Sequence, residues 1–273
     1  MKFAVNYSRE AARLVERGDI EVDLFKCPDL PEHLSEMTAL RPGYIHFPFR
    51  AGTGCTDSAD WDRVEHMVDS TDTPHVNMHL SPYVSDFPGM PLESSDPAHR
   101  AELIEAMERD VQELVAQVAP RRVVLENVMW DPIEPWMTPR AALETEVIQR
   151  VVADTGCNSL LDISHGIISA RYFGVDEKEY LSALPVDRMR EMHVSGILRD
   201  HRDLWQDHNP MTDHDWRTLE WVLERIRQGD WPAPEIVTFE YGGFGKGYEV
   251  PNSAQVLAEQ VPRLHDCIRN AEP

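Results

Sequence analysis

A (β/α)8 barrel of the TIM type is the fold class that this sequence predicts, and three observations predict it. The chain has 273 residues, a length close to the roughly 250 residues common in such barrels. Eight short β-rich runs alternate with segments of helical periodicity, which implies a parallel sheet. Acidic residues and histidines recur where those runs end, and barrels carry their chemistry at the carboxyl ends of their strands. We therefore expect one domain over residues 1–273, with an open doubly wound sheet as the alternative.

The eight predicted strands are short runs rich in β-branched and other apolar residues. They cover residues 3–7, 21–25, 43–49, 75–80, 122–128, 158–164, 189–195 and 235–241. Helical periodicity between them is clearest in residues 97–119, 141–156 and 214–229, and the last two of these segments end on a glycine suited to a helix C-cap. Shorter helix-forming segments, residues 8–18 and 28–43, follow the first two strands. Strand and helix therefore alternate along the chain.

The composition excludes several classes of partner. The chain has 48 Asp and Glu against 26 Lys and Arg, a formal net charge of -22, which repels a nucleic-acid backbone. No apolar stretch approaches the roughly 20 residues that span a bilayer, and the first residues lack the apolar core of a signal peptide. Four scattered cysteines suit a reducing compartment better than a disulfide scaffold. We expect a soluble cytoplasmic protein with no nucleic-acid or membrane partner.

Nine acidic or histidine side chains lie at or just beyond the ends of apolar runs, where they are candidate metal ligands. They are His46, His79, Glu126, Asp162, His165, His193, Asp207, His208 and Glu240. A single histidine is more often a hydrogen-bonded core or surface residue than a ligand. We expect that ordinary role for His75, His99, His201 and His214.

The acidic members of this set give the strongest argument for metal. Glu126, Asp162 and Glu240 each follow apolar residues, and a buried ionised carboxylate without a positive partner costs several kcal/mol. Divalent ions supply the missing charge. Oxygen and imidazole donors without thiolates suit Mn, Fe, Zn, Co or Mg, and up to nine donors exceed what one ion uses. We therefore predict two or three ions with bridging carboxylates, and catalytic roles for these three acids.

The loops after the strands carry candidate substrate-binding residues. Arg50 is placed to pair with a carboxylate of the substrate or to neutralise the acidic rim. Trp130 offers a stacking surface, although a tryptophan in a loop is more often a packed anchor. Lys246 lies in a glycine-rich segment after the last strand, where barrels often bind phosphate. No Gly-x-Gly-x-x-Gly opens a helix after the first strand, so we predict no nucleotide cofactor.

Several motifs carry a resemblance to a known family. The runs LENV, TGCNSLLDISH, YLSALPVDRMREMHVSG and DHNPM, in that order, resemble the multinuclear non-heme iron-dependent oxidative enzymes, the group long known as DUF692. The resemblance implies a TIM barrel of the xylose-isomerase-like superfamily that holds two or three irons. It also implies oxidation, with O2 as co-substrate, of cysteine residues in a thiol-containing peptide that a partner protein often presents. The implied ligands are His46, His79, Glu126, Asp162, His193, His208 and Glu240.

This chain departs from the family pattern at two places. His165 stands where the family usually has Asn, and Gln206 and Asp207 precede His208 where the family has Asp-x-His. A redox-neutral sugar isomerase or epimerase of the same superfamily is the alternative, with Mn or Zn as the metal and Glu126 and Glu240 exchanging a proton next to a carbonyl. An endonuclease-IV-like hydrolase and a non-catalytic metal-binding protein are the further alternatives.

Overall fold

The computed structural model describes residues 1–134, 136–242 and 252–271. Lys246 lies outside the described residues, and with it most of the glycine-rich segment that follows the last predicted strand. The described chain divides into two compact units, and each is considered by itself. Unit 1 consists of Met1–His46, His66–Pro74 and Arg190–Pro273, and unit 2 of Phe47–Glu65 and His75–Met189. The prediction of a single domain over residues 1–273 stays a prediction.

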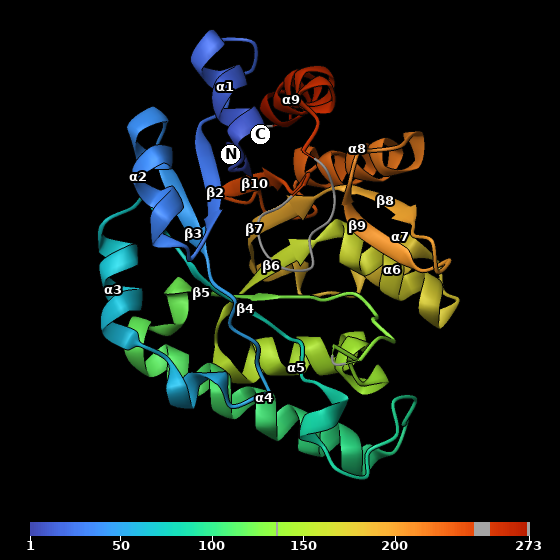
Figure 1. Cartoon of the computed structure of the whole chain (residues 1–273). Helices are drawn as coiled ribbons and strands as arrows, with labels where there is room; N and C mark the ends of the chain where they lie inside the picture. Colours follow the sequence, from blue (N-terminus) through green and yellow to red (C-terminus); the bar gives the residue numbers. More distant parts are fainter. Residues whose placement is uncertain (135, 243–251, 272–273) are drawn as a thin grey trace. The chain divides into compact units, whose positions relative to one another are not determined.

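Strands and helices alternate along the chain (Figure 1). The strands are β1 (Lys2–Asn6), β2 (Leu24–Pro28), β3 (Gly43–His46), β4 (Val76–His79), β5 (Val123–Glu126), β6 (Asn158–Asp162), β7 (Met189–Val194), β8 (Gly196–Arg199), β9 (Trp205–Asn209) and β10 (Ile236–Phe239). The helices are α1 (Arg9–Arg17), α2 (Pro31–Leu40), α3 (Trp61–Asp69), α4 (Pro97–Val118), α5 (Thr145–Thr155), α6 (Ile163–Phe173), α7 (Glu177–Ser182), α8 (Asp213–Arg227) and α9 (Ala254–Arg269). Eight parallel strands, all but β8 and β9, match the eight predicted ones and confirm the (β/α)8 fold class. In the described part of the chain, no helix is long and apolar enough to cross a membrane.

Unit 1 contains five parallel strands in the order β3, β2, β1, β10, β7. Their inward side chains form a buried layer that consists of Ala4, Leu24, Tyr44 and Ile236. Helix α1 begins where the Ser8 hydroxyl accepts a hydrogen bond from the backbone N–H of Ala11, and it ends before Gly18 in the left-handed conformation. The same helix packs on α9.

The second strand starts three residues later than its apolar pattern predicts. The sequence predicts residues 21–25, whereas β2 is Leu24–Pro28. The cause is Asp23, whose carboxylate accepts a hydrogen bond from the backbone N–H of Phe3 at 2.7 Å and forms an ion pair with Arg269 at 2.6 Å. This side chain is held beside the start of β1, so the ladder begins at Leu24 opposite Ala4. Lys26 and Cys27 therefore belong to the sheet.

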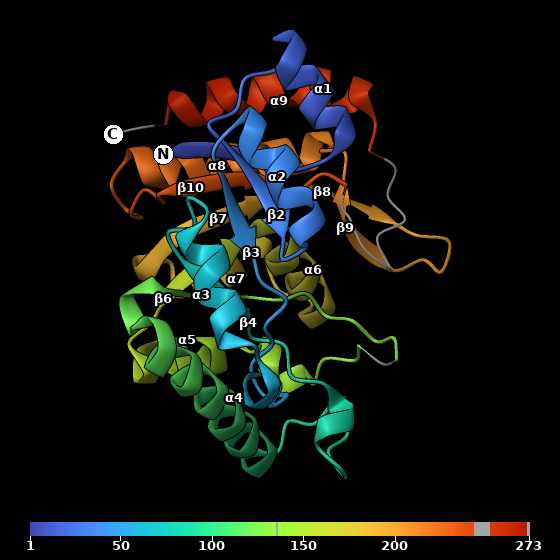
Figure 2. The same ribbon diagram turned by 60° about the vertical axis from the view of Figure 1, so that its left-hand side comes forward.

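A two-stranded hairpin follows β7 where the sequence predicts a charged loop. Strands β8 and β9 pair antiparallel, with Gly196 opposite Asn209, and Figure 2 shows them as a ribbon distinct from β7 and β10. Strand β9 carries four consecutive polar residues, Gln206 to Asn209, so a search for apolar runs does not find this hairpin. Near its end His208 has φ of 55°, a left-handed conformation that is uncommon outside glycine and is concentrated at functional sites.

Unit 2 contains the parallel strands β4, β5 and β6 with α4, α5, α6 and α7. Two asparagine side chains extend this sheet beyond its backbone ladder. Asn127 accepts from the backbone N–H of Asp162 and donates to the Asp162 carbonyl, both at 2.9 Å. Asn77 makes the same pair of bonds to the backbone of Phe47, at 2.6 and 2.9 Å. These two-sided contacts hold the chain in place just where the candidate ligands occur.

Candidate metal centre

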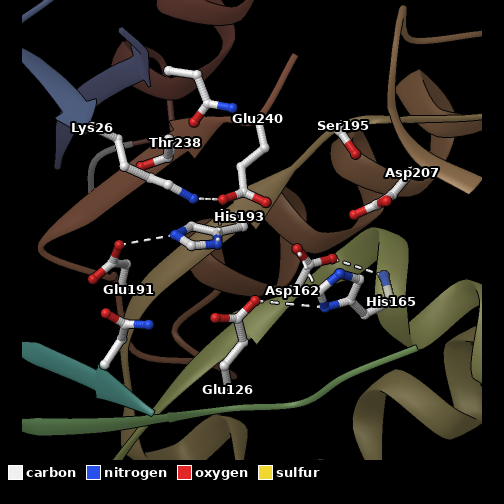
Figure 3. Close-up of polar contacts among 12 residues, drawn as sticks. Lys26, Glu126, Asp162, His165, Glu191, His193, Ser195, Asp207, Thr238 and Glu240 are labelled. Carbon is white, nitrogen blue, oxygen red and sulfur yellow. Dashed lines mark hydrogen bonds and ion pairs between the residues drawn. The ribbon is translucent and has the colours of Figure 1, made fainter. Parts of the chain in front are cut away.

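Unit 2 gathers four of the predicted ligands at the carboxyl ends of its strands. Parallel pairing places His79, the last residue of β4, opposite Glu126, the last residue of β5. Asp162 ends β6 and also caps α6, because its carboxylate accepts a hydrogen bond from the backbone N–H of His165 at 2.7 Å. Strand register and a helix cap therefore bring these side chains together. Figure 3 shows Glu126 and Asp162 with their contacts to His165 within this group.

The two acids of this group are buried and face imidazoles. Glu126 and Asp162 are each 1 % exposed. Glu126 lies 3.3 Å from His79 Nε2 and 3.5 Å from His165 Nδ1, through its two different oxygens. Asp162 lies 3.7 Å from the same His165 nitrogen. Glu126 therefore stands between two imidazoles, as a bridging carboxylate would.

Backbone carbonyls select the tautomer of both histidines. His79 Nδ1 is 2.9 Å from the carbonyl oxygen of Phe49, and His165 Nδ1 is 2.9 Å from that of Asn127. A carbonyl only accepts, so each Nδ1 carries the proton and each Nε2 keeps its lone pair. Burial lowers the pKa of His79 to about 4, so that this imidazole is neutral at pH 7. A neutral nitrogen lone pair facing a carboxylate is an arrangement that a metal cation stabilises.

Unit 1 gathers the other five predicted ligands. His193 lies on β7, Glu240 directly follows β10, and Asp207 with His208 lies on β9. His46 ends β3, and its ring centroid is 5.2 Å from that of His193. Glu240 is 3.1 Å from His193 Nδ1 and 3.7 Å from His208 Nε2, so it too stands between two imidazoles.

Each of these two histidines has its other ring nitrogen bound to an acceptor. His208 Nδ1 is 2.8 Å from the carbonyl oxygen of Gly242, which directs Nε2 toward Asp207 at 3.4 Å. His193 Nε2 is 2.9 Å from Glu191, a buried carboxylate two residues earlier on the same face of β7. Glu191 in turn accepts from the hydroxyl of Tyr44 at 2.7 Å. A carboxylate that orients a ligating histidine through its second nitrogen is a common feature of metal sites.

Unit 1 also contains a buried cation that the sequence analysis did not consider. The ammonium of Lys26, on β2, forms an ion pair with Glu240, and both side chains are buried. The protein itself therefore supplies one positive charge, the Lys26 ammonium, to the Glu240 carboxylate.

The donor sets fit metal ions in both units. Within a single unit, three groups have ligand atoms that all lie within 4.8 Å of one another. They are Glu126, Asp162 and His165 in unit 2, and in unit 1 His46, Glu191 and His193 as one group and Asp207, His208 and Glu240 as another. Eight of the nine predicted ligands belong to these groups, and the ninth, His79, lies 3.3 Å from Glu126. Their assignment as ligands and catalytic residues stays a prediction.

Two members of these clusters, Glu191 and Lys26, were missed by the sequence analysis. Glu191 had a signal, since it and His193 are spaced by two on a strand and must share a face. Lys26 had no such signal in the sequence, because the strand was predicted to end at residue 25, one residue before it. Asn127, which holds Asp162, was visible in LENV only as part of the family resemblance.

The substrate-binding candidates have different surroundings. Arg50 follows β3 and forms a parallel bridge with His79, beside the unit 2 cluster. Trp130 stacks on Tyr172 with ring centroids 4.4 Å apart and an interplanar angle of 7°, which matches the packed-anchor alternative. Near Arg50 lies the half-buried free cysteine Cys55, whose pKa is raised by burial, as expected for an ordinary thiol.

The sequence matches a family of known enzymes and individual proteins of bacteria. Residues 51–233 match the model of a family described as the RiPP precursor modification enzymes MbnB, TglH and ChrH. A UPF0276 protein of Acaryochloris marina is 26 % identical over 220 residues, which cover 76 % of this chain and 73 % of that protein.

Solved structures with low sequence identity share the fold. A xylose isomerase domain protein of Alicyclobacillus acidocaldarius has a TM-score of 0.58 at 12 % identity and covers 100 % of this chain and 99 % of its own. The 3-keto-D-glucoside 4-epimerase YcjR of E. coli has a TM-score of 0.59 at 11 % identity and covers 98 % of this chain and 100 % of its own. The predicted xylose-isomerase-like barrel is thereby confirmed.

Proposed function

The chain belongs to the MbnB/TglH/ChrH family of RiPP precursor modification enzymes, and on that premise we propose that it is a multinuclear non-heme iron oxidase. Its substrate is a cysteine-containing peptide made by the ribosome, and O2 is the co-substrate. We further propose that it acts in the cytoplasm and that a partner protein presents the peptide. Bound iron would supply the redox chemistry and an open position for O2 or a thiolate.

One observation carries the proposal: in three histidines, one ring nitrogen is bound to an acceptor and the other faces a buried carboxylate. The three are His79, His193 and His208. Surface or core histidines satisfy both nitrogens with ordinary partners. The repeated pairing of a fixed imidazole with a buried acid is what a set of metal ligands requires before the ion binds.

The roles of the two shared carboxylates follow from their contacts. Glu126 lies between His79 and His165, and Glu240 lies between His193 and His208. Each would hold metal together with its two histidines, its two oxygens allowing a bridging role, while Asp162 would supply a further carboxylate and fixes the start of α6. The substrate thiol would reach the metal as a thiolate, because thiolate is the form that binds metal.

The test is metal analysis of anaerobically purified, iron-reconstituted protein together with Mössbauer spectroscopy. The proposal expects about two or three antiferromagnetically coupled irons per chain and O2 consumption that depends on a cysteine-containing peptide. The matched control is the Glu126→Gln and Glu240→Gln double variant, which keeps the shape of both side chains and removes the bridging charge. Coupled iron that survives in this variant would contradict the bridging roles.

A redox-neutral sugar isomerase or epimerase is the alternative, and the same sample distinguishes it. That enzyme would hold a single Mn2+ or Zn2+ and consume no O2. A buried carboxylate such as Glu126 or Glu240 would then exchange the proton next to the carbonyl. A protein that holds metal but shows neither activity would favour the non-catalytic alternative.

A further inference from the structure

Arg50 forms no ion pair with an acidic residue in the described part of a strongly acidic chain. The formal net charge of the chain is -22, yet among the described residues no carboxylate lies within ion-pair distance of the Arg50 guanidinium. Arg171, near the end of α6, is by contrast 2.9 Å from Glu177.

The side chain of Arg50 is nevertheless held in place. One of its terminal nitrogens donates to the hydroxyl of Ser81 at 2.7 Å. The guanidinium carbon lies 5.2 Å from the ring centroid of Tyr83 and 5.8 Å from that of Trp136. The two rings meet edge to face, with centroids 5.6 Å apart. A guanidinium has five N–H donors, so one bond to Ser81 leaves most of its hydrogen-bonding capacity for a ligand.

The surrounding loops keep this arrangement accessible. A backbone hydrogen bond from Val84 to Met137, 2.9 Å long, joins the loop after β4 to the loop after β5. Trp136, on the second of these loops, is 51 % exposed. Most large aromatic side chains bury their surface, so an exposed tryptophan beside a half-buried arginine is typical of a binding surface.

The backbone of Arg50 places it next to the unit 2 cluster. It pairs with His79 in a parallel bridge, and the backbone of the flanking Phe49 and Ala51 exchanges hydrogen bonds with His79, both 2.9 Å long. A ligand bound by Arg50 is therefore held beside a candidate metal ligand.

We propose that Arg50, flanked by Tyr83 and Trp136, binds a carboxylate of the peptide substrate and positions the peptide at the unit 2 cluster. The inference rests on the proposed function for the peptide nature of the ligand. A guanidinium binds either a carboxylate or a phosphate through two parallel hydrogen bonds, but a carboxylate carries the single negative charge that one guanidinium balances, whereas a phosphate dianion next to Glu126 and Asp162 would need more than one cation. The carboxylate is either the C-terminal group of the cysteine itself or an acidic side chain next to it.

Three short probes separate these sources: acetyl-Gly-Cys with a free C-terminus, acetyl-Gly-Cys amide, and acetyl-Asp-Cys amide. Their binding is measured by calorimetry on the anaerobic iron-loaded protein and, separately, on the zinc-loaded protein. The wild-type protein is expected to bind one of the two carboxylate probes at least about tenfold more tightly than the amide. Preference for the first probe identifies the C-terminus, and preference for the third identifies the side chain.

Variants assign that preference to the guanidinium. In Arg50→Gln the tenfold preference is expected to disappear while metal content stays at the wild-type level, and Arg50→Lys should retain only part of it because it lacks the planar fork. Arg171→Gln is the matched control and should keep the full preference. Equal binding of all three probes by the wild type, or a preference that survives in Arg50→Gln, overturns the inference. Carboxylate preference in a protein that consumes no O2 would instead refute the oxidase and leave Arg50 as a binding residue.

Discussion

Lys26 and Glu240 form a buried ion pair within unit 1. They come from β2 and from the residue after β10, which flank β1 in the sheet, so the lysine reaches past one strand to the acid. Glu240 also faces His193 and His208. The ammonium thus supplies positive charge at a carboxylate that the proposed function assigns to metal, so this buried acid has a cationic partner within the protein.

Removing this ammonium should strongly destabilise the metal-free protein. Lys26→Met keeps the length of the side chain and leaves Glu240 buried without its cation, so the free energy of unfolding is expected to fall by about 3 kcal/mol. Urea denaturation in the presence of a chelator measures this. The double variant Lys26→Met, Glu240→Gln should recover part of the loss, because it removes the buried charge as well. A single variant as stable as the wild type would show that the pair contributes nothing.

Glu191 is expected to act on metal binding through His193. Its carboxylate holds His193 Nε2 and is itself held by Tyr44. Glu191→Ala should weaken zinc binding by about 10- to 100-fold, the usual effect of losing the residue that orients a ligand. Glu191→Gln keeps an oxygen that can accept from His193, so its effect should be smaller. Calorimetric zinc titration compares the two, with Tyr44→Phe as a milder control. Equal losses for Ala and Gln would mean that Glu191 binds metal directly.

Asp162 has two roles that substitution can separate. Its carboxylate caps α6 by accepting from the N–H of His165 and lies in the Glu126, Asp162, His165 cluster. Asp162→Asn keeps an oxygen for the cap, whereas Asp162→Ala loses it at about 1 kcal/mol of stability. Both variants should lose about one metal ion per chain, measured by elemental analysis, while only the alanine variant melts at a lower temperature without metal. Full metal content in either variant would remove Asp162 from the ligand set.

Stability at high pH should depend on Tyr7. Burial and the hydrogen bond from its hydroxyl to Glu36 raise the pKa of Tyr7 to about 12. The unfolded chain loses this proton near its ordinary pKa of about 10, so between pH 10 and 12 deprotonation stabilises the unfolded state and lowers the free energy of unfolding. The contribution of Tyr7 is therefore present below pH 10 and declines by up to about 1.4 kcal/mol per pH unit above it. Urea denaturation from pH 9 to 12 should show a shallower decline for Tyr7→Phe. Parallel curves would contradict the raised pKa.

The strands were predictable because short runs of apolar, β-branched residues are typical of buried strands. The candidate ligands were predictable because the carboxyl ends of parallel strands lie at the same edge of the sheet. What escaped prediction depends on contacts between distant parts of the chain. The start of β2 is decided by Asp23, whose partners Phe3 and Arg269 are far from it in sequence. Lys26 is paired with a residue 214 positions later, and no local pattern encodes such a pair. The β8–β9 hairpin carries polar residues on both faces, so its sequence has the composition of a loop.

Gly196 provides a last test, because it places the Asp207 and His208 strand. It lies opposite Asn209 in the hairpin, and a Cβ at this position would be 1.9 Å from the carbonyl oxygen of Pro210. The backbone of Asn209 and Pro210 cannot move aside as a flexible side chain can. Gly196→Ala must therefore push the end of β9 away from β8.

The expected result of Gly196→Ala is loss of metal from the Asp207, His208, Glu240 cluster with retention at the Glu126, Asp162, His165 cluster. Elemental analysis of Gly196→Ala should therefore show a partial loss of metal. The double variant Gly196→Ala, Asp162→Asn should contain less metal than Gly196→Ala alone. Gly229→Ala is the control, since Gly229 has φ of 75° with no atom within 4 Å of an added Cβ. It should lose stability by about 1 kcal/mol through backbone strain and keep all of its metal. Unchanged metal content in Gly196→Ala would mean that the hairpin does not position these ligands.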